Sequence, residues 1–173
     1  MLFRSGVFWP CPQDEHPGTP RMFLDRFATP DGRARFVAVE HRPAAEEPDP
    51  DYPLYLTTGR VLSQYQSGAQ TRRIRSLAGE PFVELHPDLA DRLGVVAGDA
   101  VAVTTRRGTA TAPARISESI RTDTVFMPFH YAGAGRVNAI TNDALDPISR
   151  MPEFKVCAAR LSVASGDPVG RPA

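Results

Sequence analysis

The feature that most constrains this chain is an apolar run that ends in a polar, arginine-bearing loop. Residues 54–58, Leu-Tyr-Leu-Thr-Thr, are rich in aromatic and β-branched side chains and predict a short strand. Gly59 and Arg60 follow at its carboxyl end, where they place a flexible backbone beside a fixed positive charge. We therefore expect this strand to deliver a loop, residues 60–73, that suits an anion.

The loop and its flanks supply three kinds of hydrogen-bond donor that recognise phosphate. Small residues leave backbone N–H groups accessible, and side chains add hydroxyl and guanidinium groups. These side chains belong to Thr57, Thr58, Ser63, Ser67, Arg60, Arg72, Arg73 and Arg75. Backbone nests and arginine forks both bind phosphate oxygens. The residues alone also allow a plainer interpretation, a polar surface loop with solvated arginines.

A second strand and a short helix are predicted next along the chain. Residues 81–85 are the strand candidate. Residues 87–93 predict a helix with Pro87 in its first turn, and Gly94 is its expected stop. His86 precedes this helix, and we expect it to cap the helix rather than to act as a ligand or an acid–base group.

A hairpin is predicted after the helix. Residues 100–105 and 109–116 are expected to pair across residues 106–108. Because Pro113 cannot donate to a ladder, we expect it at a sheet edge or a bulge. Alternation and turn spacing alone indicate a mixed, mostly β barrel or sandwich.

The C-terminal third repeats the pattern of a strand followed by a permissive loop. Residues 124–129 predict a buried strand, and the loop after it contains Gly133 and Gly135, which would allow close approach to a ligand. Residues 154–161 predict the last strand, and the tail from Ser162 is expected to fray.

The first 50 residues predict an extended arm and not a packed domain. They are dense in proline and charge and show no helical period. A brief strand is expected at residues 34–39, after the turn at residues 30–32, and residues 43–53 predict a solvated acidic linker. The arm carries large apolar side chains that we expect to be covered by a partner, namely Phe8, Trp9, Met22, Phe23, Phe27 and Phe36.

Composition excludes several classes of function. The chain has 173 residues and a formal net charge of zero, which offers no general attraction to nucleic acid or to an anionic membrane surface. Cys11 and Cys157 match neither a disulfide framework nor a metal-ligand spacing, so we expect free thiols in a reducing compartment, by default the cytoplasm. No self-contained catalytic set can be defended.

The loop also carries a family resemblance. Residues 56–73, Leu-Thr-Thr-Gly-Arg-Val-Leu-Ser-Gln-Tyr-Gln-Ser-Gly-Ala-Gln-Thr-Arg-Arg, resemble the loop that opens the C-terminal molybdopterin-dinucleotide-binding domain of the dimethyl sulfoxide reductase superfamily of molybdenum and tungsten oxidoreductases. The chain is most similar to bacterial assimilatory nitrate reductases. The resemblance implies a double-psi β-barrel (aspartate decarboxylase-like barrel), which we expect at residues 51–162. The arm and linker then span residues 1–50, and a disordered tail is expected at residues 163–173.

The resemblance implies a cofactor and the residues that hold it. The loop would wrap the guanosine diphosphate half of one molybdopterin guanine dinucleotide, and later landmarks match the family's second cofactor-contacting segment. The implied cofactor-binding residues are Thr58, Gly59, Arg60, Val61, Leu62, Ser63, Gln64, Tyr65, Gln66, Ser67, Asn138, Asp143 and Lys155. Phe129 matches a position on the substrate side in related periplasmic nitrate reductases, and with His130 it would line a substrate funnel.

Individual roles follow from side-chain chemistry. Arg60 and the adjacent backbone would neutralise the diphosphate, and Lys155 would add a point charge. A carboxylate can accept from guanine N1–H and N2–H together, so Asp143 or Asp88 is expected to read the base. The sequence leaves that choice open.

The resemblance also limits what the chain does by itself. The molybdenum ligand and the iron–sulfur cysteines of the superfamily lie in an earlier part of the parent enzyme, so we expect no catalytic or metal-ligating residues here and no turnover by this chain alone. The expected function is cofactor binding as the C-terminal domain or fragment of a molybdenum oxidoreductase that reduces nitrate to nitrite. Two alternatives stay open, a formate-dehydrogenase-like parent and a stand-alone double-psi barrel that acts as a binding module.

Overall fold

The computed structural model describes residues 8–164, apart from the side chains of Arg72, Arg75 and Ala78. Its contacts divide the chain into two units, Met1–His41 and Arg42–Ala173. All helices and strands of the described residues lie in the second unit. No helix within residues 8–164 combines the length and apolar character that crossing a bilayer requires. The predicted tail lies outside the described residues from position 165 onward.

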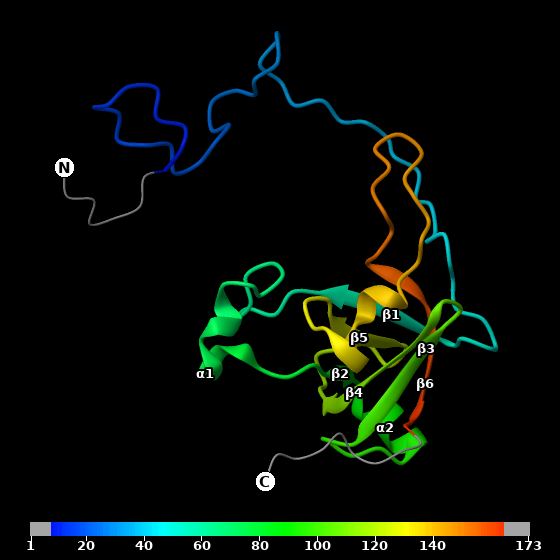
Figure 1. Cartoon of the computed structure of the whole chain (residues 1–173). Helices are drawn as coiled ribbons and strands as arrows, with labels where there is room; N and C mark the ends of the chain where they lie inside the picture. The colour runs from blue at the N-terminus through cyan, green and yellow to red at the C-terminus, as the bar shows by residue number, and fades with distance from the viewer. Residues whose placement is uncertain (1–7, 165–173) are drawn as a thin grey trace. The chain divides into compact units, whose positions relative to one another are not determined.

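Six strands close into a barrel in the second unit (Figure 1). They are β1 (Leu54–Gly59), β2 (Val83–Leu85), β3 (Ala100–Thr105), β4 (Gly108–Ile116), β5 (Thr124–Pro128) and β6 (Val156–Val163). Their order around the barrel is β1-β5-β2-β4-β3-β6. β1 with β5 and β2 with β4 are parallel, and the other pairs are antiparallel. The fold is the double-psi β-barrel that the sequence predicts.

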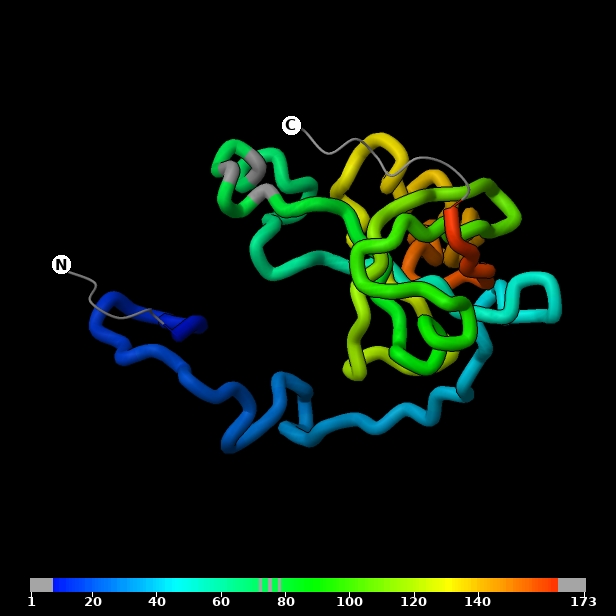
Figure 2. The backbone as a smooth tube through the Cα atoms, turned by 90° about the horizontal axis from the view of Figure 1, so that it is seen from below, coloured from blue at the N-terminus to red at the C-terminus, as the bar shows by residue number. Residues whose placement is uncertain are grey.

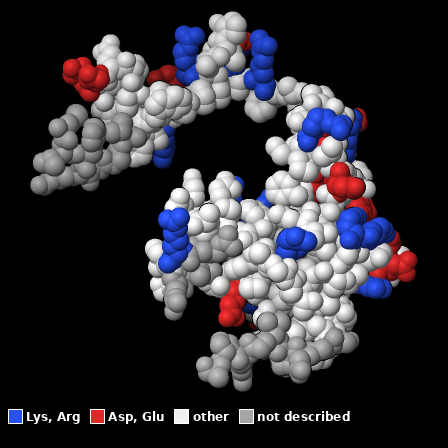
Figure 3. Space-filling model, in the orientation of Figure 1, with Lys and Arg blue, Asp and Glu red and all other residues white. Residues whose placement is uncertain are grey.

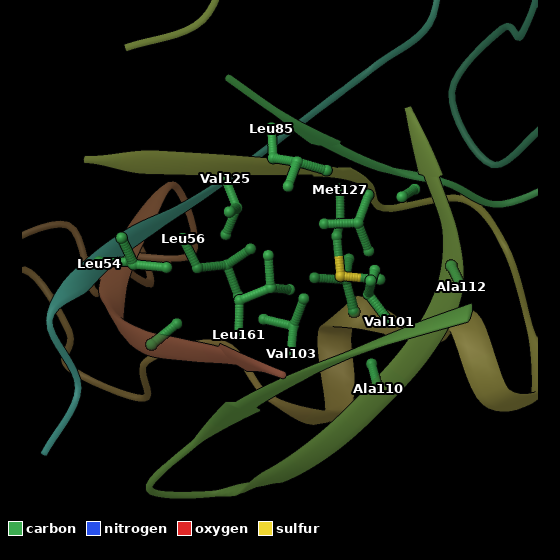
Figure 4. Close-up of a cluster of buried hydrophobic side chains, with 14 of the residues drawn as sticks. Leu54, Leu56, Leu85, Val101, Val103, Ala110, Ala112, Val125, Met127 and Leu161 are labelled. Carbon is green, nitrogen blue, oxygen red and sulfur yellow. The ribbon is translucent and has the colours of Figure 1, made fainter. Parts of the chain in front are cut away.

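The barrel interior is filled by alternate side chains of the strands. β1 buries every second residue, and Leu56 has no exposed surface. Figure 4 shows Leu56 among Val125, Met127 and Val103, which come from β5 and β3 and are also fully buried. Alternation places these side chains inside because successive strand residues point to opposite faces.

The helix predicted at residues 87–93 forms with those bounds as α2 (Pro87–Leu93). The His86 ring nitrogen Nδ1 accepts from the Asp88 N–H at 3.1 Å, so the predicted capping role of His86 is confirmed. Gly94 ends the helix with φ of 65°, a left-handed conformation that glycine adopts without a Cβ clash. The sequence did not predict the short elements η1 (Thr71–Arg73), α1 (Arg75–Ala78), η2 (Gly133–Gly135) and η3 (Val137–Ala139).

Three local expectations need correction. Residues 34–39 form no strand and have no ladder partner among the described residues. Pro113 does not lie at a sheet edge, because the barrel is closed, and the one-to-one register of β3 with β4 shows no bulge at Pro113. It faces Ala100 at the end of the β3 ladder, and pairing with β2 begins one residue later. The last strand spans 156–163, two residues beyond the predicted range, and leaves residues 154 and 155 in the preceding loop.

The predicted solvated linker is instead a strap, residues 44–52, that is bound to the barrel by its acids. The Glu46 side chain is only 14% exposed; it accepts from Arg107 and from the Ala158 N–H of β6 at 2.9 Å, and it forms an ion pair with Arg106 at 3.1 Å. Burial alone would raise the pKa of Glu46, but the hydrogen bonds from Arg107 and Ala158 outweigh it and lower the pKa. Asp49 pairs with Arg106, and acidic and basic atoms intermingle on this side of the molecule in Figure 3.

Candidate functional site

The topology brings three loops to one end of β1, here called the site end. Parallel pairing sets Gly59 opposite Pro128, so the loops after β1 and after β5 begin side by side. Antiparallel pairing sets Thr57 opposite Val156, so the segment that precedes β6 arrives at the same end. Ligands of sheets that contain parallel strands often bind beyond the carboxyl ends of those strands.

The first loop is a long excursion, residues 60–82, which leaves the barrel after β1 and returns at β2 (Figures 1 and 2). Its return limb packs against the loop after β5. A Cβ on Gly135 would lie 2.7 Å from the Cβ of Pro81, and a Cβ on Gly79 would lie 2.9 Å from the Tyr131 hydroxyl. Position 135 therefore needs glycine for this close approach to the proline ring, and position 79 needs it because its φ is 60°.

Thr58 and Lys155 tie the end of β1 to the start of β6. The buried Thr58 hydroxyl donates to the Phe154 carbonyl at 2.8 Å, and the Lys155 ammonium donates to the Thr58 carbonyl at 3.0 Å. Lys155 therefore has a fixed position at the site end, and it keeps two further N–H donors to offer a ligand.

Two cations flank one aromatic ring at the same place. The Arg60 guanidinium carbon lies 6.0 Å from the Phe129 ring centroid, and the Lys155 Nζ lies 5.4 Å from the same centroid. The Phe129 ring also contacts the Phe154 ring in an edge-to-face arrangement. Cation–π contacts of this length hold positive charge without neutralising it. The site end therefore presents positive charge that no acid among the contacts described here cancels.

An open cavity of about 610 Å³ lies within the excursion. Its lining residues are Arg60, Val61, Leu62, Ser63, Gln64, Tyr65, Gln66 and Thr71. The N–H groups of Leu62, Ser63, Tyr65 and Gln66 donate to no described residue, so these four donors are available to a ligand. Gln66 has φ of 51°, and a left-handed residue in such a turn arranges neighbouring N–H groups into an anion-binding concavity.

Gln64 has a different environment from its neighbours in the loop. It is 3% exposed; its amide nitrogen donates to the Leu77 carbonyl, and its amide oxygen accepts from the Thr71 hydroxyl at 2.8 Å. The side chain thus joins the outgoing and returning limbs of the excursion. Sequence reasoning placed Gln64 among the ligand contacts and gave no signal of this internal bond.

The loop between β5 and β6 contains the other residues singled out from the sequence. Phe129 is partly buried at the cation-flanked position, and its N–H donates to the Gly59 carbonyl at 3.1 Å. His130 is buried with its ring 4.0 Å from the Tyr131 ring. Asn138 in η3 and Asp143 beyond it are both exposed.

A buried polar contact in this loop was missed. Asn142 is 7% exposed, and its amide donates to the Glu153 carboxylate at 2.9 Å. Glu153 also accepts from the Ala45 N–H of the strap at 3.0 Å. These bonds fix both sides of the loop next to Asp143. The acid at 153 and the amide at 142 could have been noticed as a pair, but their spacing predicts no contact by itself.

The structure separates Asp88 from the site end. β2 runs antiparallel to β5, so the helix that follows it lies beside the start of β5 and not beside its end. Arg92 of α2 donates to the Thr122 carbonyl, just before β5, and this contact confirms the placement. Figure 1 likewise shows α2 at the opposite end of the barrel from the loop that precedes β6. Asp143 is therefore the better placed of the two carboxylates considered as guanine readers.

Comparison with known proteins decides the family. The family model "Molydopterin dinucleotide binding domain" matches residues 54–159. The chain belongs to this family. The matched range runs from the first residue of β1 into β6 and includes the whole excursion and the loop between β5 and β6.

Two curated relatives share 46% of aligned residues with this member of the family. One is the assimilatory nitrate reductase catalytic subunit of Bacillus subtilis (strain 168), aligned over 162 residues; the other is the F420-dependent formate dehydrogenase subunit alpha of Methanocaldococcus jannaschii, aligned over 160. Each alignment covers 91% of this chain, but only 23% and 24% of the respective relative. The chain thus spans about a quarter of the length of these relatives.

A solved structure supports the fold. Acetylene hydratase from Pelobacter acetylenicus superposes with a TM-score of 0.54 and 22% sequence identity, over 66% of this chain and 19% of that protein. At this level of identity the likeness concerns the barrel architecture.

Proposed function

We propose that this chain binds the guanosine diphosphate half of molybdopterin guanine dinucleotide at the site end of the barrel. The observation that carries the proposal is the cavity of the excursion, in which available backbone N–H groups stand beside Arg60. Charge-assisted bonds from backbone and guanidinium donors are the usual means by which proteins hold a diphosphate. The donor set at the site end fits this group.

Different residues would contact different parts of the ligand. Arg60 and the N–H groups of residues 62–66 would hold the diphosphate, and Lys155 would add its two remaining donors. Asp143 would accept from the guanine edge, since Asp88 lies elsewhere. Thr58 and Gln64 would act indirectly, because their side chains hold the loops in position. When bound, the pterin end of the cofactor supplies the metal-centred redox chemistry.

The parent protein is proposed to be a molybdenum oxidoreductase that contains this barrel together with other domains and an iron–sulfur cluster. The barrel would then contribute cofactor affinity and orientation, and Phe129 and His130 would line the approach of substrate. Nitrate is the proposed substrate, since the loop at residues 56–73 resembles that of assimilatory nitrate reductases and the Bacillus subtilis relative is such an enzyme. The equal identity to a formate dehydrogenase subunit supports formate as the second candidate. We place the parent in the bacterial cytoplasm, in nitrate assimilation.

Replacing the matching part of the Bacillus subtilis enzyme with this chain tests the proposal. Arg60→Gln and Lys155→Met should each lower the affinity for the guanine dinucleotide by about 10- to 100-fold, because each removes a charge-assisted bond. The measured amounts of guanine dinucleotide and molybdenum retained per protein should therefore fall. Arg92→Gln on α2 removes another exposed arginine, at the far end of the barrel, and is the matched control. Unchanged retention in both site variants would contradict the proposed site. Nitrate and formate assays of the unsubstituted chimera distinguish the two parents.

A further inference from the structure

Residues 34–39 of the arm, Ala-Arg-Phe-Val-Ala-Val, have the character of a strand but lack a strand's partner. They belong to no helix, strand or turn, and their N–H and C=O groups form no hydrogen bond with any described residue. Phenylalanine and valine are among the residues that favour strands. Backbone groups of such a segment are satisfied either by water or by another strand.

The side chains of this segment are exposed on both faces. Phe36 is 99% exposed, Val37 77% and Val39 85%. In a strand, Phe36 would point to one face, and Val37 and Val39 to the other. A strand that is apolar on both faces is typical of one covered on both sides. Within residues 8–41 only Gly18 is buried, so the described arm has no hydrophobic core of its own that could bury these three side chains.

An ordered turn leads into the segment. The Gly32 N–H donates to the Thr29 carbonyl at 3.0 Å, and the Phe27 N–H donates to the Gly32 carbonyl at 2.9 Å. The Asp31 carboxylate accepts from the Arg33 N–H at 3.1 Å. The turn therefore fixes where the segment starts, which reduces the conformational entropy lost when residues 34–39 pair.

We propose that residues 34–39 become a strand by adding to an open sheet edge in the remainder of the parent polypeptide. Alignments that cover 91% of this chain span residues 34–39, and they occupy only about a quarter of each relative, so proteins of this kind contain a large further part of the same polypeptide that is available to cover this segment. Main-chain hydrogen bonds would supply affinity, and the apolar side chains on both faces would be covered by that partner. The identity of the partner rests on the proposed function.

Peptide-resolved hydrogen exchange compares the 173-residue chain with the same sequence inside the Bacillus subtilis chimera. In the isolated chain, amides of residues 34–39 should exchange at the rate of unstructured peptide. In the chimera they should slow by at least about 100-fold, as amides in a paired strand do. Either Val37→Pro or Ala38→Pro should remove this slowing, because alternate N–H groups of the added strand face the sheet and proline supplies none. Val37→Thr keeps both the N–H and the strand preference and should retain it.

The outcomes separate this inference from the proposed function. Fast exchange of residues 34–39 in a chimera that retains guanine dinucleotide would overturn the inference and leave the proposed function intact. Slow exchange already present in the isolated chain, with a doubled mass in solution, would also overturn it, because a second copy would then be the partner. Slow exchange in a chimera without cofactor would support strand addition and count against the proposed function.

Discussion

The barrel and the arm both contain large apolar residues, but only the barrel buries them. Leu56 and Met127 are fully enclosed by neighbouring strands, whereas Phe36 and Trp9 are 99% and 78% exposed. Each barrel strand finds its ladder partners within residues 54–163. The arm has the side chains of a buried segment and no partner strand in the described chain. A segment with strand-forming side chains therefore becomes a strand only where a partner strand is available.

The largest effect is expected in the barrel core. Leu56→Ala should lower the free energy of unfolding by about 3 kcal/mol, because it removes buried methyl groups and leaves a cavity among β1, β3 and β5. Denaturant titration followed by circular dichroism measures the change. A loss below about 1 kcal/mol would mean that the interior collapses around the gap or that the strand is less buried than described.

The strap should contribute next. Glu46→Gln should lower the free energy of unfolding at neutral pH by about 2 kcal/mol, because it leaves Arg107 without its charged partner in a partly buried site. The pKa of Glu46 is lowered in the fold, so its contribution is present above the unfolded value of 4.5 and is lost as the pH falls through the folded value.

Thermal unfolding of both proteins between pH 7 and pH 2 measures this dependence. Other carboxylates also titrate in this range, so the relevant quantity is the difference between native protein and variant. That difference should shrink as the pH falls. A difference that stays constant across the range would mean that the charge of Glu46 is not what binds the strap.

Gln64 is expected to matter for the excursion more than for the barrel. Gln64→Ala should lower the free energy of unfolding by no more than about 1 kcal/mol, because it cuts bonds within a surface loop. Protection of the excursion amides from exchange should fall, and affinity for guanosine diphosphate should drop severalfold, since the loop must then be ordered by the ligand. Equal protection in native protein and variant would contradict the role of Gln64 as the link between the two limbs.

The smallest effect is expected in the arm. Phe36→Ser should change the free energy of unfolding of the isolated chain by less than about 0.5 kcal/mol, because the ring has almost no contacts to lose. Differential scanning calorimetry of this variant beside Leu56→Ala gives the comparison in one experiment. A loss of 2 kcal/mol or more at Phe36 would break the distinction between the two regions.

The elements that were predicted best from the sequence are those whose defining residues lie within one short stretch. α2 was predicted with its bounds because Pro87 and Gly94 mark a start and a stop within one short stretch. β1 and the β3–β4 hairpin were predicted from alternation and a turn. The strap was missed because the pairing of Glu46 with Arg107 joins residues far apart in sequence. The strand expected at residues 34–39 failed for a related reason, since periodicity says nothing of whether a partner strand is present.

The candidate site was predictable in position and less so in detail. The strand ending at Gly59 does deliver the loop with the cavity, and Lys155 does reach the same end of the barrel. The sequence could not show that Gln64 is used internally. Nor could it choose between Asp88 and Asp143, because that choice depends on the direction in which β2 runs beside β5.

The most direct test of the central claim is a titration of the ¹⁵N-labelled chain with guanosine diphosphate, followed residue by residue by nuclear magnetic resonance. We expect amide shifts to concentrate in residues 58–67, at Asn138 and Asp143, and at Lys155, while the amides of α2 and of residues 117–123 do not shift. Shifts centred on α2, or no shifts at millimolar ligand, would contradict the claim that the site end of this barrel holds the guanosine diphosphate half of the cofactor.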